Sequence, residues 1–145
     1  AARAAGKGLF VLVKTSNASS GWTTDLPAPE GTLADRIADQ CEKWSYETVG
    51  ASGYGLVGAV VGATYPEEAA RLRARMPHAL ILAPGLGAQG GSLDAIRASR
   101  GKDGHGVLVP VSRGLVPAAD ETAKHGFRGA MRARALGFVA ELSEL

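Results

Sequence analysis

The residues best suited to chemistry lie in one glycine-rich stretch, APGLGAQGG at residues 83–91. Its glycines allow positive φ and let backbone N–H groups approach a ligand closely. They are Gly85, Gly87, Gly90 and Gly91. Gln89 adds a side-chain amide, and the helix predicted from Leu93 adds an N-terminus, which favours an anion. The pattern predicts a loop that binds phosphate, although an ordinary glycine-rich turn between a strand and a helix has the same pattern.

A second group of candidate ligands is Ser112-Arg113-Gly114, which directly follows another apolar run. In parallel α/β folds, ligands bind beyond the carboxyl ends of the strands, where the following loops meet. Consecutive strands of a barrel would therefore bring the glycine-rich loop and Arg113 side by side. We expect these two loops to form a phosphate clamp.

The elements that would position these loops are four strand–helix units in succession. Nearly continuous apolar runs predict buried parallel strands at residues 8–15, 56–63, 79–83 and 106–111. Helical spacing predicts helices at 32–50, 64–76, 93–99 and 118–142. Thr32 is the expected N-cap of the first, and Pro66 lies in the first turn of the second. Residues 16–31 are expected to form a long polar loop. Together these units predict an α/β fold with a parallel sheet and right-handed crossovers.

Length, composition and charge exclude several classes of protein. The 145 residues are enough for one domain, and the net charge of +2 comes from scattered residues rather than a basic run, so nucleic-acid binding has no specific support. Two groups of arginines are expected to be solvated on helix faces. They are Arg71, Arg73 and Arg75, and Arg132 and Arg134. The sequence has no apolar run long enough to cross a membrane.

Cysteine and histidine give no sign of a metal or disulfide framework. The single cysteine, Cys41, agrees with a reducing cytoplasm and is expected to be a buried, inert thiol within a helix. His78, His105 and His125 are far apart and have no ligand-like spacing, so we expect no metal.

Four sequence blocks together resemble the carboxyl-terminal half of orotidine 5′-phosphate decarboxylase, of the branch with longer bacterial chains. They are VKTSN at 13–17, VVGATYPE at 60–67, PGLGAQGG at 84–91 and SRG at 112–114. The blocks occur in the family's order and extend over most of residues 1–145. The resemblance implies a lyase with an eight-stranded (β/α)8 TIM barrel, of which this chain would form about four units, a half barrel.

The resemblance also implies an activity and roles for particular residues. The family works as a homodimer without a cofactor and converts orotidine 5′-monophosphate to uridine 5′-monophosphate and carbon dioxide in pyrimidine biosynthesis. By matching motif, Ser16 would hydrogen-bond the pyrimidine, and Gln89 and Arg113 would hold the 5′-phosphate. Pro84 would lie on the closing loop beside the base. Lys14 is expected inside the barrel, paired with an acid outside this chain.

Departures from the family's pattern limit what this chain is expected to do. Ala18 replaces a frequent proline, and Pro110-Val111 replace a frequent polar pair before Ser112. The reactive motif Asp-x-Lys-x-x-Asp is absent from residues 1–145. We therefore expect a phosphate- and base-binding half that is inactive alone and needs an amino-terminal half as partner. The alternative is a stand-alone phosphate-binding half barrel, and the opening residues Ala1-Ala2-Arg3 favour the first hypothesis.

Overall fold

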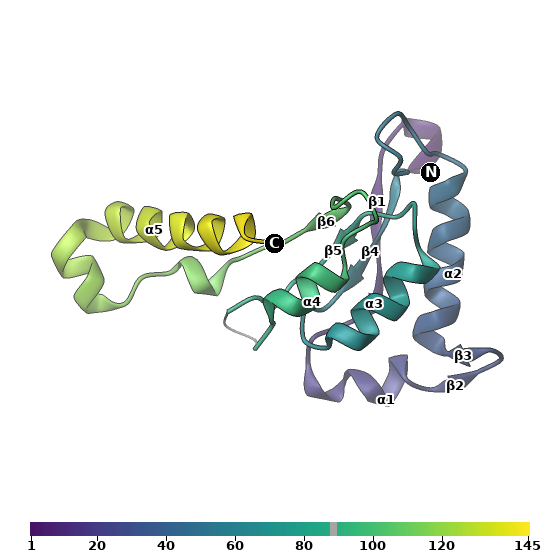
Figure 1. The fold of residues 1–145 in the computed structure, drawn as a ribbon, viewed down its shortest axis with the longest axis horizontal. Helices are drawn as coiled ribbons and strands as arrows, with labels where there is room; N and C mark the ends of the chain where they lie inside the picture. The colour runs from purple at the N-terminus through teal and green to yellow at the C-terminus, as the bar shows by residue number, and fades with distance from the viewer. Residues whose placement is uncertain (88–89) are drawn as a thin grey trace.

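A four-stranded parallel sheet forms the centre of the computed structural model, which describes residues 1–87 and 90–145. The strands lie in sequential order, β1-β4-β5-β6 (Figure 1). Their bounds are Leu9–Lys14 for β1, Val57–Val61 for β4, Ile81–Leu82 for β5 and Val107–Leu108 for β6. The predicted parallel α/β fold with four strand–helix units is thus confirmed.

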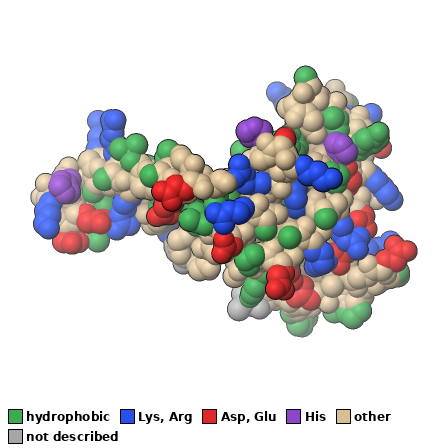
Figure 2. All heavy atoms as spheres, viewed as in Figure 1, with side chains coloured by type: hydrophobic (Ala, Val, Ile, Leu, Met, Phe, Trp, Pro, Cys, Tyr) green, Lys and Arg blue, Asp and Glu red, His purple; other side chains and the backbone are tan. Residues whose placement is uncertain are grey.

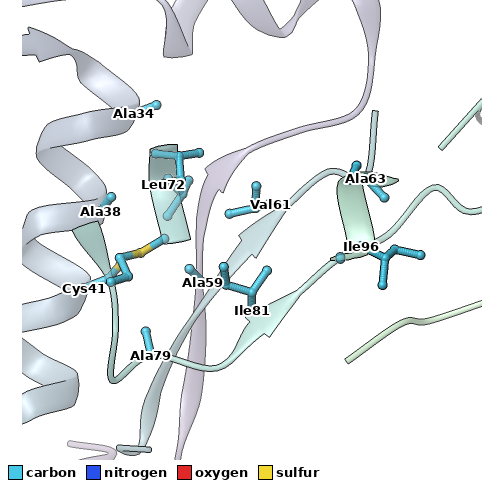
Figure 3. Packing of buried hydrophobic residues seen from close by; sticks show 14 of the residues in the cluster. Ala34, Ala38, Cys41, Ala59, Val61, Ala63, Leu72, Ala79, Ile81 and Ile96 are labelled. Carbon is cyan, nitrogen blue, oxygen red and sulfur yellow. The ribbon is translucent and has the colours of Figure 1, made fainter. Parts of the chain in front are cut away.

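Three helices pack against one side of this sheet (Figure 1). They are α2 (Leu33–Tyr46), α3 (Pro66–Arg75) and α4 (Leu93–Ala98). Most of the residues in the buried cluster between the sheet and these helices are small (Figure 3). Ala59 and Ala63 come from the sheet side, and Ala34 and Ala38 come from α2. Because these side chains are short, the helices can approach the sheet closely, and Leu72, Ile81 and Ile96 fill the remaining space.

The other face of the sheet carries large apolar side chains that stay partly exposed. Phe10 is 42% exposed, Leu12 is 55% exposed and Leu108 is 46% exposed. Phe10 also lies over Gly58, where a Cβ atom would be 2.4 Å from the phenyl ring. Large exposed apolar areas of this kind mark surfaces that another chain or segment covers.

Local sequence signals set where the helices begin. The Thr32 side chain accepts a hydrogen bond from the Asp35 backbone N–H at 3.3 Å, and the Asp35 carboxylate accepts one from the Thr32 N–H at 2.9 Å. This reciprocal capping box confirms Thr32 as the N-cap of α2. Pro66 occupies the first turn of α3, as predicted, and Ser92 caps α4 by accepting from Ala95 N–H at 3.1 Å.

Residues 16–31, predicted as a long polar loop, contain short regular elements. They contain two short helical segments, η2 (Ala18–Ser20) and α1 (Gly21–Thr24), and a small antiparallel ribbon of β2 (Pro27–Ala28) with β3 (Gly31–Thr32). The Thr24 hydroxyl donates to the Ser20 carbonyl at 2.7 Å, which closes one helical turn. Such local bonds satisfy the backbone within the segment and need no apolar periodicity.

The last predicted strand and helix also differ in detail. β6 ends at Leu108, two residues before Pro110, which has no N–H to donate to a ladder. The final helix, α5 (Ala119–Ser143), is divided at Gly126, whose φ of 68° and ψ of 158° are not helical. Two short 3-10 turns, η1 (Arg3–Ala5) and η3 (Arg113–Leu115), complete the fold. Within the described residues, no helix has the length and hydropathy needed for a transmembrane span.

Replacing Thr32 by Ala should destabilise the chain by about 1 kcal/mol, because the Asp35 N–H at the start of α2 loses its acceptor. Urea denaturation followed by circular dichroism measures the change. Thr122→Ala is the control, since that exposed hydroxyl lies in α5, away from the sheet. Equal stability of the Thr32→Ala and wild-type chains would contradict the role of the cap.

Candidate functional site

The carboxyl ends of the strands are joined to one another by backbone hydrogen bonds. Gly62 N–H donates to the Lys14 carbonyl at 2.9 Å, and Ala63 N–H donates to the Pro84 carbonyl at 2.9 Å. Ala83 N–H donates to the Leu108 carbonyl at 2.8 Å. The segments that carry the predicted site residues therefore start from one edge of the sheet.

The glycine-rich loop is closed on itself by short-range contacts. Three of its glycines have positive φ, namely 114° at Gly85, 79° at Gly87 and 74° at Gly90. Gly91 N–H donates to the Gly85 carbonyl at 3.0 Å, and a Cβ atom on Gly91 would lie 2.6 Å from that oxygen. Gly91 is needed for this close approach rather than for its φ. Gln89 and Ala88 lie outside the described residues, so the place of Gln89 in a phosphate clamp stays a prediction.

The glycine-rich loop and the Ser112-Arg113-Gly114 segment both pack against Phe138 of α5. A Cβ atom on Gly114 would lie 2.9 Å from Phe138 Cζ, and one on Gly87 would lie 3.4 Å from it. Arg113 is exposed in η3, directly before Gly114. Both loops thus lie beside the same aromatic ring of α5. The convergence of Arg113 and Gln89 on one phosphate stays a prediction.

Arg134 fastens α5 to the same segment. Its guanidinium donates to the Gly114 carbonyl at 3.1 Å and the Val116 carbonyl at 3.0 Å, and it pairs with Glu121 at 2.7 Å. The prediction that Arg134 is a solvated residue is therefore wrong. Helical spacing showed neither this contact nor that of Phe138, because it does not tell which loop a helix face will meet.

Among the arginines of α3, Arg73 is buried rather than solvated, whereas Arg71 is exposed, as predicted, and Arg75 is half-buried. Arg73 is only 7% exposed and donates to the Ala79 carbonyl, and burial lowers the pKa of its guanidinium. Arg71 and Arg75 pair with Asp35 of α2, which is itself buried. These contacts hold α3 against α2, and Figure 2 shows basic and acidic side chains mixed over this side of the molecule.

Ser16 lies against the end of β4. A Cβ atom on Gly62 would be 2.7 Å from the Ser16 backbone nitrogen, so the two chains touch at this point. The Thr64 hydroxyl donates to the Ser16 carbonyl at 3.4 Å. Pro84, the other predicted base-side residue, is half-buried and is held through its carbonyl by Ala63. Ser16 and Pro84 are therefore both hydrogen-bonded to residues that follow β4, Thr64 and Ala63.

Lys14, which was expected to pair with an acid outside the chain, has two acidic partners within it. It is 4% exposed and forms ion pairs with Asp25, at the end of α1, and with Glu68, in the first turn of α3, the second at 3.6 Å. A register shift between Leu12 and Lys14 interrupts the alternation of faces along β1. Because of this bulge, Lys14 is buried whereas Leu12 is half exposed.

Two further titratable residues, Cys41 and His78, are held by packing and pairing within the fold. Cys41 is fully buried, as predicted, and desolvation raises the pKa of its thiol to about 11. His78 pairs with Glu42 at 2.5 Å and packs edge-on against Tyr46. Among the described residues, no group of three or more His, Cys, Asp or Glu side chains could hold a metal ion.

Parallel βα units in sequential strand order, with helices on one side of the sheet and polar loops at the carboxyl ends of the strands, are the arrangement of (β/α)8-barrel proteins, and this chain has four such units. No protein-family model matches the chain. The chain is 48% identical over 109 residues to orotidine 5′-phosphate decarboxylase of Rhodopirellula baltica, covering 75% of this chain and 36% of that protein. It is 42% identical to the protein of the same name from Caldicellulosiruptor bescii, covering 76% of this chain and 36% of that protein.

Solved structures give the same result. A crystal structure described as an orotidine-monophosphate decarboxylase of Toxoplasma gondii matches with a TM-score of 0.81 and 38% identity, over 95% of this chain and 50% of that one. The Leishmania donovani OMP decarboxylase matches with a TM-score of 0.70 and 37% identity, over 97% of this chain and 50% of that one. The chain is therefore homologous to orotidine 5′-phosphate decarboxylases. It spans little more than a third of the first two curated relatives.

Replacing Gly91 by Ala should destabilise the chain by about 1–3 kcal/mol, because the added methyl meets backbone atoms that cannot move aside. Gly137→Ala is the matched control: nothing lies within 4 Å of the added methyl, and a helical alanine should stabilise α5 by about 0.5–1 kcal/mol. Urea denaturation of both variants measures the two changes. A neutral Gly91→Ala variant would show that the loop is not closed as described.

Proposed function

We propose that this chain supplies the phosphate- and base-binding half of an orotidine 5′-phosphate decarboxylase, a cytoplasmic enzyme of pyrimidine biosynthesis. The observation that carries the proposal is the meeting of the glycine-rich loop and the Arg113 segment on Phe138, at the carboxyl ends of neighbouring strands. In (β/α)8 barrels the last two loops commonly form a phosphate site. Homology to proteins named for this activity supports the same proposal.

In this proposal the chain binds the substrate away from the reacting carbon. Arg113 and Gln89 hold the 5′-phosphate, together with backbone N–H groups of the glycine loop and Ser112. Ser16 hydrogen-bonds the pyrimidine, and Pro84 lies beside it. Binding energy from such remote groups holds the reacting centre in place and is used to lower the barrier there. The chemistry needs no cofactor in this proposal.

The reacting groups are proposed to come from outside residues 1–145. Loss of carbon dioxide leaves negative charge on the pyrimidine ring, so the reaction needs a cation to stabilise that charge and to deliver a proton. The motif Asp-x-Lys-x-x-Asp, which would supply carboxylates and an ammonium, is absent from this sequence. A segment that carries it would cover the exposed face of Phe10, Leu12 and Leu108, and the complete enzyme would form a homodimer.

Replacing Arg113 by Ala should weaken binding of uridine 5′-monophosphate by about 1.5–3 kcal/mol, the value of a hydrogen bond to a charged group. Ligand-observed NMR titration of the 145-residue chain measures the affinity. His125→Ala is the control, because His125 is exposed on α5 and belongs to no predicted site segment. Equal affinities of the Arg113→Ala and wild-type chains would remove Arg113 from the site.

The 145-residue chain alone should release no carbon dioxide from orotidine 5′-monophosphate, since it lacks the reacting groups. A chimaera in which the aligned part of this chain replaces the matching 109-residue segment of the Rhodopirellula baltica relative should be active. Release of labelled carbon dioxide measures both. Turnover by the chain alone would contradict the division of roles. An inactive but folded chimaera that still binds the nucleotide would favour a stand-alone phosphate-binding half barrel instead.

A further inference from the structure

We propose that Lys14 is a positioning residue for pyrimidine binding, which it serves by fixing the segment 15–17 through ion pairs with Asp25 and Glu68. This inference rests on the proposed function, because it concerns how Ser16 is presented to the base. Lys14 itself has no contact with the ligand in this proposal. Its side chain lies between the end of α1 and the start of α3, where it pairs with Asp25 and Glu68.

The burial of Lys14 shows that its charge is committed to these two partners. The side chain is 4% exposed, and a buried ammonium is tolerated only when it is paired. Asp25 is the residue directly after α1, and Glu68 lies in the first turn of α3. One side chain therefore connects the end of β1 with the segment that follows α1 and with the start of α3.

The acids depend on Lys14 in turn. Glu68 Oε2 is buried and has no hydrogen-bond partner within the described residues, although Glu68 Oε1 lies 3.6 Å from the Lys14 ammonium. Glu67 and Tyr65 line the same hollow of about 420 Å³. Without the ammonium, this hollow would hold an unbalanced group of carboxylates, and α1 would be repelled from α3.

The backbone of Lys14 links this ion-pair cluster to Ser16. The Lys14 carbonyl accepts from Gly62 N–H at 2.9 Å, and Gly62 also approaches Ser16 so closely that a Cβ atom on it would lie 2.7 Å from the Ser16 nitrogen. The bulge between Leu12 and Lys14 ends the regular ladder just before the segment begins. The direction in which residues 15–17 leave the sheet is thus set by the Gly62 contact on one side and the Lys14 ion pairs on the other.

This arrangement separates base binding from phosphate binding. Lys14 holds the Ser16 segment, whereas Gly87, Gly114 and Arg134 belong to the contacts that hold the phosphate loops against α5. A defect at Lys14 should therefore affect ligands that carry a pyrimidine and spare those that carry only a phosphate. A merely structural role would weaken both kinds of ligand together.

The test compares the affinities of uridine 5′-monophosphate and ribose 5-phosphate for the 145-residue chain. Lys14→Met should weaken binding of the nucleotide by about five- to tenfold, the loss of roughly one hydrogen bond, and change ribose 5-phosphate by less than about twofold. Lys14→Arg keeps the charge and should restore most of the nucleotide affinity. Arg75→Met is the matched control, since it removes a cation from Asp35 and Asp39 at the carboxyl end of α3, two turns away from Glu68.

Equal losses for both ligands, or no loss for either, would overturn the proposal. Glu68→Gln removes only one of the two partners, so it allows the same comparison if Lys14→Met does not fold, and unchanged nucleotide affinity there would also overturn it. The proposed function fails differently. In that case the wild-type chain would bind neither ligand, or Arg113→Ala would leave both affinities unchanged.

Discussion

The backbone of Ala63 is the point on which the arrangement of the candidate site depends. Its N–H donates to the Pro84 carbonyl and its carbonyl accepts from Ser92 N–H, both at 2.9 Å. A single residue just after β4 thus holds both ends of the glycine-rich loop, which follows β5 and leads into α4. Such a loop can bend only between its fixed ends, and its glycines supply the positive φ that the bend requires.

The amino ends of the strands carry packing contacts, whereas the carboxyl ends carry the predicted site residues. At the amino ends of the strands, the His78 carbonyl accepts from both Gly55 N–H at 2.9 Å and the Ser45 hydroxyl at 2.6 Å. Gly55 lies so close to α2 that a Cβ atom there would be 2.0 Å from the Ser45 carbonyl oxygen. These contacts join helix and sheet, whereas the carboxyl ends carry all the predicted site residues. Division of stability and function between opposite ends is typical of parallel barrels.

Much of the fold could be predicted because it follows from local signals in the sequence. Four apolar runs identified the strands, and Thr32 and Pro66 identified the starts of two helices. The pairing of the two loops of the candidate site followed from the order of the strands alone. Gln89 is different, since the structure does not describe it and its role stays a prediction.

The errors concern features that depend on tertiary contacts. Lys14 was expected inside the barrel from the resemblance. The register shift between Leu12 and Lys14 changes the alternation of faces along β1, and no glycine or proline in the sequence marks that position. The ion pairs of Lys14 and the contacts of Arg134 join residues distant in sequence, so helical and strand periodicities contain no information about them. The contacts of Phe138 with Gly87 and Gly114 also join residues distant in sequence, so the helical pattern of α5 does not predict them.

The accessibility of the Cys41 thiol reports on the separation of α2 from the sheet. Cys41 is the only thiol in the sequence, lies fully buried in α2 where that helix meets the sheet, and has a pKa raised to about 11 (Figure 3). A thiol reagent reacts with the thiolate, so it can modify Cys41 only after α2 has moved away from the sheet. The rate of alkylation therefore measures how often this layer separates, without any label having to be introduced.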